Sequence, residues 1–534
     1  MSGLRVALVN APLRSLVCDL GVGHQMPLGM LMIGGPLLQD GHSVELIDAA
    51  REHISPREIV ARLRMSRPDV VLTGHVGSTS AHPAAIRTLR AVKRALPTAT
   101  MVYGGVHPTY RYREVLTRHP EVDVVVRGEG EETTRDLIDA LAMGRDLASV
   151  PSIAWRRNGE TVLNTARVPM QDLDALPIGW DLIRDWDAYK AFGLGRAAVV
   201  QFSRGCPFTC TFCGQWMFWK RWRHRAVELF LDELEFLHLD RGVRFFWLAD
   251  ENPTTIKEVW HDVLQGIVDR GLDIRMCASI RTQDIVRDAD ILPLYRRAGF
   301  AYVLMGVETV TDARMAAIRK GSTVDDAFTA IRLLRDNGIL SIVDHIFGLE
   351  EETPRTLARA YRGLEAYDGD FVNALYLTPH SWTPLGRELS AKPVVEHDLG
   401  KWDYRHQVLA VPGMSVSALF TGVKLIEAAY HLSPRRVIRL LREPDPRIRQ
   451  LLRYSFLHTT LVFGAEVVEF VRDAASRRRA ARPVRRGGST ATALAFQLGA
   501  RNGRRRAHPG YRSLVKTIPA TGGPRWPTES QPAN

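Results

Sequence analysis

The sequence Gly205-Cys-Pro-Phe-Thr-Cys-Thr-Phe-Cys213 places three cysteines within eight residues, in a C-x3-C-x2-C arrangement. It directly follows a β-rich run at 198–202, which is the first strand of a series of alternating strands and helices. A loop in this position lies at the carboxyl end of a strand, where parallel βα folds bind their ligands. We therefore expect the thiols of Cys206, Cys210 and Cys213 to lie at the ligand-binding site of the fold.

Three thiolates suit a [4Fe–4S] cluster, because they bind three of its four irons and leave one open to a chelating ligand. The alternative is a zinc site, which requires four ligands, usually in two separated pairs. No second pair is present: Cys18 and Cys277 are distant, and only His224 offers a further donor nearby. We expect Cys277 to be a small buried residue of a strand and assign no role to Cys18.

The pattern of apolar runs predicts an α/β protein with two series of strands. The first series predicts an open parallel sheet, with strands at 4–9, 43–47, 70–73, 100–103 and 122–126. The second predicts a partial or complete parallel barrel, with strands at 198–202, 244–249, 274–279, 302–307, 340–347 and 372–377. Ligands of both parts are expected at the loops that follow the strands.

These patterns divide the 534 residues into five segments. They are a Rossmann-like domain at 1–145, a connector at 146–190 with a hairpin turn at Asn158-Gly159, a βα barrel at 191–390, a helical region at 391–473 and a basic tail at 474–534. The tail lacks apolar periodicity and contains runs of arginine, so we expect it to be disordered.

The formal net charge of +12 comes from the tail, which contains 13 Lys and Arg and one acid, so the rest of the chain is formally neutral. Arginine runs without interleaved aromatic residues attract nucleic acid only non-specifically, so no specific nucleic-acid partner is expected. We also expect no signal peptide and no transmembrane span. Closely spaced cysteines without a disulfide pattern favour a cytoplasmic protein.

The cysteine motif resembles the signature of the radical S-adenosylmethionine (SAM) superfamily, and further motifs follow at successive strand ends. They include Ala249-Asp-Glu-Asn-Pro253 and Met305-Gly-Val-Glu308, and later Arg319-Lys-Gly321 and the segment 348–353. The resemblance implies a [4Fe–4S] cluster on Cys206, Cys210 and Cys213. It also implies SAM contacts from Asp250, Glu251, Ser279, Arg281 and Glu308.

The first 145 residues resemble the cobalamin-binding domain found in many of these enzymes. The resemblance implies cobalamin contacts from residues in four loops that follow strands: Asn10, Gly74, Ser78, Gly104, Gly105, His107, Thr109, Gly128 and Glu129. The D-x-H-x-x-G motif that supplies a cobalt ligand in many cobalamin proteins is absent. The nearest string, Asp40-Gly-His42, has Glu45 in place of the glycine and precedes a strand. A nucleotide-binding or degenerate Rossmann-like domain remains the alternative.

The aromatic run in Cys206–Trp222 and the string Lys401-Trp-Asp-Tyr-Arg-His-Gln-Val-Leu409 resemble the anaerobic oxidative cyclase family of bacteriochlorophyll synthesis. This implies formation of the fifth ring of a magnesium porphyrin ester, with an electron donor such as flavodoxin or ferredoxin. The alternative is a cobalamin-dependent radical SAM methyltransferase that acts on an unactivated carbon. Helical spacing puts Trp216 and Trp219 on one side, which favours core packing over a wall for a flat macrocycle.

Overall fold

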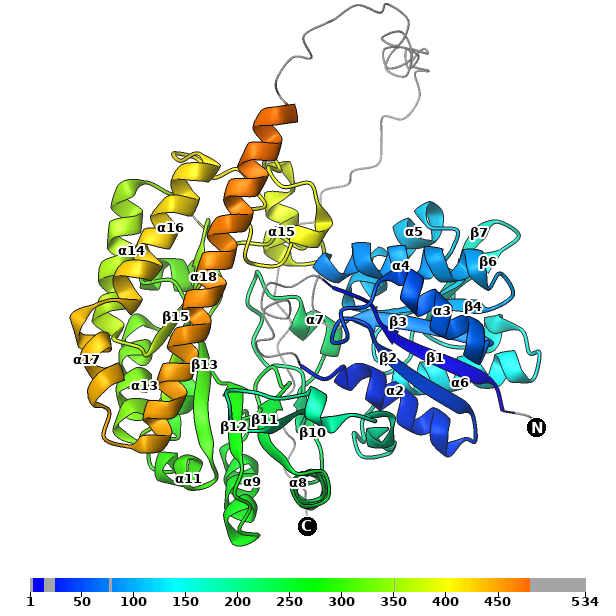
Figure 1. Cartoon of the computed structure of the whole chain (residues 1–534), viewed down its shortest axis with the longest axis horizontal. Helices are drawn as coiled ribbons and strands as arrows, with labels where there is room; N and C mark the ends of the chain where they lie inside the picture. Colours follow the sequence, from blue (N-terminus) through cyan, green and yellow to red (C-terminus); the bar gives the residue numbers. More distant parts are fainter. Residues whose placement is uncertain (1–2, 14–24, 76–78, 350, 481–534) are drawn as a thin grey trace, which may run out of the picture. The chain divides into compact units, whose positions relative to one another are not determined.

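The structure is a computed structural model that describes residues 3–13, 25–75, 79–349 and 351–480 (Figure 1). Cys18, Ser78 and the tail from residue 481 lie outside this part of the chain. Residues 1–469 form one compact unit that contains both predicted sheets. None of the helices in the described ranges is long and apolar enough to span a lipid bilayer.

The first sheet has seven strands in the order β2-β1-β3-β4-β5-β6-β7. Their bounds are β1 Arg5–Asn10, β2 Ser43–Asp48, β3 Val70–His75, β4 Thr100–Gly105, β5 Val124–Val126, β6 Ile153–Arg157 and β7 Glu160–Leu163. The first five strands pair in parallel, as predicted. The antiparallel hairpin of β6 and β7 extends the sheet and turns at Asn158-Gly159, so the connector contributes to the first sheet.

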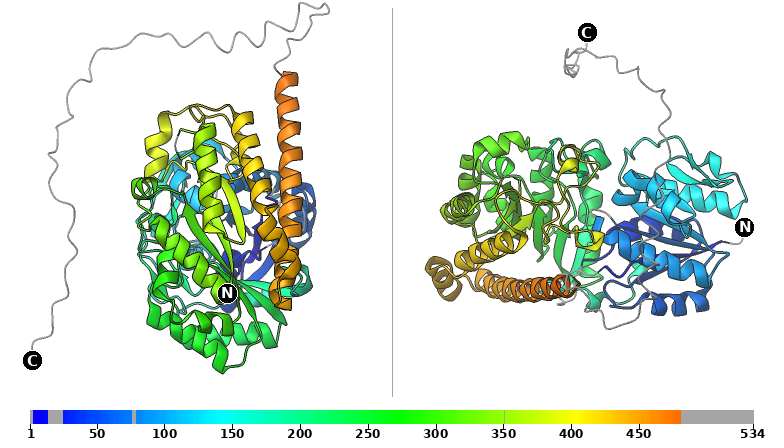
Figure 2. Two further views of the ribbon diagram at one scale, coloured as in Figure 1. Left: turned by 90° about the vertical axis from the view of Figure 1, so that its left-hand side faces the viewer. Right: turned by 90° about the horizontal axis from the view of Figure 1, so that it is seen from above.

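Helices cover both faces of this sheet, as Figures 1 and 2 show in blue and cyan. They are α2 Leu28–Gln39, α3 Pro56–Ser66, α4 His82–Ala95, α5 Val106–Arg118 and α6 Glu131–Ala142. Alternate residues of each strand point to opposite faces. Ala7 and Val9 pack with α3, α4 and α5, whereas Val6 and Leu8 pack with α2 and α6. The carboxyl ends of the strands therefore remain free for ligand-binding loops.

The second sheet has six strands in the order β15-β14-β13-β12-β11-β8, and every pair is parallel. The bounds are β8 Arg196–Val200, β11 Val243–Leu248, β12 Arg275–Ser279, β13 Phe300–Glu308, β14 Leu340–Phe347 and β15 Phe371–Tyr376. In the part of the chain that the structure describes, β8 and β15 do not pair. The barrel is therefore partial, the first of the two predicted forms.

Helices pack on the outer face of the second sheet and bury its largest apolar cluster. They include α8 Val227–Leu239, α9 Lys257–Asp269, α10 Thr282–Arg287, α11 Leu292–Arg297, α13 Val324–Asp336 and α14 Pro354–Tyr367. The C-terminal helices are α16 Val416–His431, α17 Pro434–Arg442 and α18 Pro446–Ala480. These confirm a mainly helical C-terminal region, although residues 391–415 contain no α-helix.

The inner face of the second sheet is closed at the amino ends of its strands. There Phe192 stacks on Tyr302, with ring centroids 4.8 Å apart, and also contacts Phe245. Leu451 and Leu452 of α18 join the same buried cluster. With this end filled, the carboxyl ends of the strands are left for the cysteine loop.

Candidate functional site

The cysteine loop connects β9 (Ser203–Arg204) to α7 (Gln215–Trp219). β9 pairs antiparallel with β10 (Arg223–His224), which joins the two ends of the loop region. Gly205 has φ +91°, and a Cβ there would lie 2.4 Å from the carbonyl oxygen of Arg221. Only glycine fits this turn, so the backbone fixes how the loop leaves the strand.

The thiols of Cys206, Cys210 and Cys213 are close enough to influence one another. Burial chiefly, and then the Glu251 carboxylate and the other two thiols, raise the pKa of Cys213 to about 12. The guanidinium Nη1 of Arg281 lies 3.9 Å from Sγ of Cys210. Three thiols, one buried and two partly exposed, beside a cation fit a metal cluster that binds the thiolate form.

Within the described ranges, no three His, Cys, Asp or Glu side chains surround the position of a single metal ion. In a four-iron cluster each cysteine binds a different iron, so its donors stand farther apart than those of one ion. Cys277, the fourth described cysteine, is buried in β12, as predicted for a core residue.

Asp250 was predicted to contact SAM, and the structure places it at the end of β11 with both oxygens engaged. It accepts hydrogen bonds from the backbone N–H of Phe202 (3.1 Å) and from the hydroxyl of Ser203 (2.6 Å). Burial raises its pKa to about 6. Asp250 therefore ties β11 to the chain that leads into the cysteine loop.

Glu251 lines a cavity next to the cysteine loop, together with Gln215 and Trp219. Burial raises the pKa of Glu251 to about 7. The Trp219 side chain interacts with the Glu251 carboxylate and lowers this pKa, against the effect of burial. The side-chain carbonyl of Gln215 is buried and has no hydrogen-bond partner among the described residues. Because an unpaired buried polar atom is costly, Gln215 fits a polar ligand in the cavity.

The other three predicted SAM residues lie at the ends of β12 and β13. Ser279 is exposed. The guanidinium of Arg281 lies 3.5 Å from the ring centroid of Phe208 in the cysteine loop. Glu308 has φ +63° and its carboxylate lies 2.7 Å from the ammonium of Lys320. A non-glycine residue in this conformation is strained, which is typical of functional sites.

The cavity has a volume of about 390 Å³ and is lined by residues of both sheets. Six of the nine predicted cobalamin residues line it: Asn10, Gly74, Gly104, Gly105, Gly128 and Glu129. Glu251, Trp219 and Phe218 also line the cavity, and they belong to the segment at 191–390 that contains the radical SAM motifs. The loops that were predicted to bind two different cofactors thus share one cavity.

Glycine lets the backbone form part of the cavity wall. A Cβ on Gly74 would lie 2.8 Å from the carbonyl oxygen of Gly104, so the two strand ends approach more closely than side chains allow. Gly128 has φ +74°. A wall without side chains fits a broad, flat ligand such as a corrin ring, which the residues of this site can accommodate.

Two further predicted cobalamin residues, Thr109 and His107, are not among the described residues that line the cavity. Thr109 accepts a hydrogen bond from the N–H of Gly128 (3.0 Å), so it positions the neighbouring loop. His107 is buried and stacks on His82, with ring centroids 4.3 Å apart. Ser78 lies outside the described residues.

Sequence reasoning did not identify the buried ion pairs beside the cavity. Arg204, which directly precedes the cysteine loop, lies 2.9 Å from Glu129 and also pairs with Glu131. Arg223 of β10 lies 2.7 Å from Glu129. Arg204 and Glu129 are 4% and 8% exposed, so the pair is desolvated. The only indication of these ion pairs in the sequence was the charged Arg204, which follows an apolar run.

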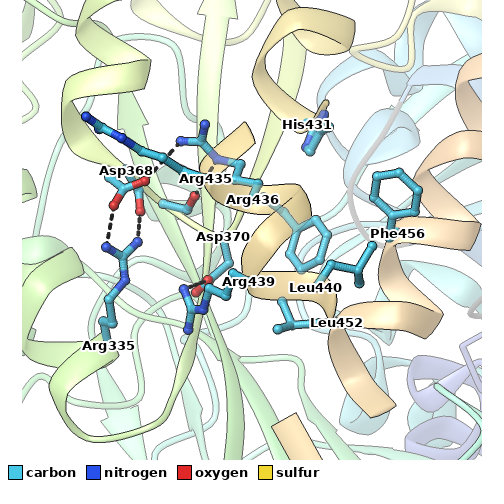
Figure 3. A pocket seen from close by; sticks show the side chains of 12 residues that line it. Arg335, Asp368, Asp370, His431, Arg435, Arg436, Arg439, Leu440, Leu452 and Phe456 are labelled. Carbon is cyan, nitrogen blue, oxygen red and sulfur yellow. Dashed lines mark hydrogen bonds and ion pairs between the residues drawn. The ribbon is translucent and has the colours of Figure 1, made fainter. Parts of the chain in front are cut away.

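A second cavity, of about 140 Å³, lies between α17 and the start of β15 (Figure 3). Three of its arginines are paired: Arg335 with Asp368, Arg436 with Glu365, and Arg439 with Asp370. His431 also has both ring nitrogens engaged, by the N–H of Val372 and the carbonyl of Glu427. We interpret this cluster as a brace that holds α17 against the sheet.

Comparison with known proteins agrees with this site. Residues 200–364 match the Radical SAM superfamily and residues 17–138 match the B12 binding domain. A radical SAM domain implies a [4Fe–4S] cluster and SAM, and a B12 binding domain implies cobalamin. The fold is similar to that of TsrM from Kitasatospora setae, a radical SAM methyltransferase solved with cobalamin and a [4Fe–4S] cluster. The TM-score is 0.64, with 17% identity over 81% of this chain and 90% of TsrM.

Two curated relatives carry the same description, anaerobic magnesium-protoporphyrin IX monomethyl ester cyclase. The protein from Synechocystis is 42% identical over 468 residues, which cover 88% of this chain and 93% of the relative. The protein from Rubrivivax gelatinosus is 33% identical over 75% of this chain and 73% of the relative. The chain is therefore a radical SAM enzyme with a B12 binding domain, and it belongs to the family of anaerobic magnesium-protoporphyrin IX monomethyl ester cyclases.

Proposed function

We propose that this enzyme closes the fifth ring of magnesium-protoporphyrin IX monomethyl ester without oxygen. The observation that carries the proposal is the shared cavity, where the glycine loops of the first sheet face Glu251 and Trp219 beside the cysteine loop. A substrate between these walls can meet both cofactors. The 42% identity to the cyclase of Synechocystis supports this choice of substrate.

When bound, the cluster and SAM supply hydrogen-atom abstraction, and cobalamin supplies a second redox centre. The residues of this chain position and shield these groups. We propose that Cys206, Cys210 and Cys213 hold the cluster and that Arg281, near Cys210 Sγ, offsets negative charge there. Glu251 and Gln215 offer a carboxyl group and an unpaired amide carbonyl to the polar end of SAM, and Trp219 orients Glu251.

Asp250 has a different proposed role, since its oxygens bind the backbone at Phe202 and Ser203. It fixes the geometry of the loop instead of contacting SAM. Arg204 and Glu129 join the cysteine loop to the glycine loop at Gly128. We propose that this ion pair fixes the position of one cofactor site relative to the other.

Anaerobic incubation of the reconstituted enzyme with the magnesium ester, SAM, cobalamin and a strong reductant tests the proposal. We expect a cyclised porphyrin, methionine and 5′-deoxyadenosine. In the same assay a methyltransferase, the alternative that the fold similarity to TsrM favours, yields S-adenosylhomocysteine and a product heavier by one CH₂ unit. Absence of cyclised product from a fully loaded enzyme contradicts the proposal. We further propose a cytoplasmic location and a flavodoxin- or ferredoxin-type electron donor.

A further inference from the structure

Within the string Lys401–Leu409, the side chains of Asp403, Arg405 and His406 make hydrogen bonds or ion pairs. Asp403 accepts a hydrogen bond from the N–H of Arg405 (3.0 Å) and lies 2.9 Å from Nδ1 of His406. Arg405 pairs with Glu466 of α18, and His406 Nε2 lies 3.7 Å from Glu469. These contacts anchor the segment to α18, and none of them involves Tyr404.

Tyr404 has φ +67°, a strained conformation for a residue with a Cβ. Its backbone is pinned on both sides: the N–H donates to the Thr378 hydroxyl (3.1 Å), and the carbonyl accepts from Tyr376 (2.7 Å). The residue is 37% exposed, so part of its ring is accessible to a ligand.

A chain of contacts leads from Tyr404 to the cysteine loop. The Tyr404 hydroxyl lies 2.9 Å from Nε2 of His380. His380 stacks on Trp382, with centroids 4.8 Å apart and planes 9° apart. A Cβ on Gly214, the residue after Cys213, would lie 2.5 Å from Nε1 of Trp382. Three close contacts thus separate the phenol from a predicted cluster ligand.

On its other side His380 is connected to the first sheet. Its Nδ1 lies 3.0 Å from the hydroxyl of Thr79, which in turn lies 3.4 Å from Nδ1 of His107. Burial lowers the pKa of His380 to about 4 and that of His107 to about 2, so both rings are neutral. A neutral imidazole has one donor and one acceptor nitrogen. When Nε2 of His380 is the donor, the O–H of Tyr404 is free to donate to a ligand.

We propose that Tyr404 is a substrate-binding residue whose hydroxyl donates a hydrogen bond to a carbonyl oxygen of the porphyrin ester. His380 and Thr79 are positioning residues: His380 contacts the phenol hydroxyl, and Thr79 contacts the other ring nitrogen of His380. This inference rests on the proposed function and names a specificity contact within it. A neutral donor suits an ester or keto oxygen, whereas a cation would favour a free carboxylate.

Binding tests the inference without turnover. The shift of the porphyrin absorption band is followed while magnesium-protoporphyrin IX monomethyl ester is titrated into full-length protein. We expect Tyr404→Phe to weaken binding about three- to tenfold, the effect of one lost hydrogen bond. Tyr361→Phe, in a partly buried position on the outer helix α14, is the matched control and should bind as wild type does. Equal affinity of wild type and Tyr404→Phe overturns the inference.

Turnover provides the second readout. Because a misplaced substrate does not stop SAM cleavage, Tyr404→Phe should raise the ratio of 5′-deoxyadenosine to cyclised porphyrin at least severalfold, with unchanged iron content. Thr79→Val should raise the ratio less, since it only weakens the orientation of His380. If both variants keep the wild-type ratio, Tyr404 has no role in positioning. If wild type neither binds nor converts the porphyrin, the proposed function and this inference both fail.

Discussion

Gly214 lies against the indole of Trp382, so closely that a Cβ at residue 214 would stand 2.5 Å from Nε1 and 3.0 Å from Cδ1. Gly214 follows Cys213 and begins α7, while Trp382 follows β15 by six residues. The ring also stacks on Tyr110 of α5, with centroids 5.3 Å apart. One tryptophan therefore contacts both the cluster loop and helix α5, which packs on the first sheet.

Gly214→Ala should force Trp382 out of its place, because the indole is 6% exposed and has little room to move. We expect a loss of about 1–3 kcal/mol in stability, as in other overpacked sites, and slower SAM cleavage. Thermal unfolding and 5′-deoxyadenosine formation measure both effects. A second change, Trp382→Leu, should restore part of the stability by removing the clash.

Gly464→Ala is the matched control, since an added Cβ there meets no atom within 4 Å. This glycine lies within α18, where alanine is the better helix former, so stability should stay the same or rise by up to about 1 kcal/mol. If Gly214→Ala behaves like this control, Trp382 does not confine the cluster loop.

Arg204→Met should destabilise the protein strongly. It leaves the buried carboxylates of Glu129 and Glu131 without their partner, which costs about 3–5 kcal/mol in comparable buried pairs. We expect a lower melting temperature together with weaker cobalamin binding, measured by equilibrium dialysis. Arg244→Gln breaks an exposed pair with Asp273 and should cost less than about 1 kcal/mol. If the two variants lose the same stability, the buried ion pair contributes no more to stability than an exposed one.

The sequence predicted those features that depend on local patterns. Apolar runs located the parallel strands of both sheets to within about two residues, because a strand that is buried on both faces is a short continuous apolar run. The strands β6 and β7 were not predicted; only the turn between them was. The spacing of Cys206, Cys210 and Cys213 predicted a cluster loop, which stays a prediction, and glycines such as Gly74 and Gly104 were correctly expected at the ends of their strands, where they line the cavity. Each of these signals is contained in a short stretch of chain.

Pairings between distant residues could not be predicted in this way. Arg204 and Glu129 are 75 residues apart, and Thr79 and His380 are 301 apart. Asp250 illustrates a different difficulty: a carboxylate after a strand suits both a cofactor contact and a backbone anchor. Only the positions of Phe202 and Ser203 show that both of its oxygens bind the backbone.

Replacement of any one cysteine of the loop by alanine should abolish the cluster. Cys206→Ala, Cys210→Ala and Cys213→Ala each remove one of three expected iron ligands, so reconstituted protein should lose the cluster absorption and all SAM cleavage. Cys277→Ala removes a thiol that is buried in β12 and should retain iron, with a modest loss of stability. Iron and sulfide content per chain decide the matter. Full iron loading of the Cys210→Ala protein would contradict the assignment.

Asp344 of β14 gives the protein a pH-dependent stability. Burial chiefly, and then Glu308, raise its pKa to about 7, against the opposing effects of the Asn373 hydrogen bond (2.9 Å) and Lys320. The folded chain thus holds a proton that the unfolded chain releases near pH 4, so stability falls as pH rises between those values. Asp344→Asn should remove this loss and gain up to about 3 kcal/mol over wild type at pH 8. Melting temperatures from pH 5 to pH 8 test it, with the 83% exposed Asp181→Asn as control. Parallel curves for wild type and Asp344→Asn would mean that Asp344 ionises normally in the folded protein.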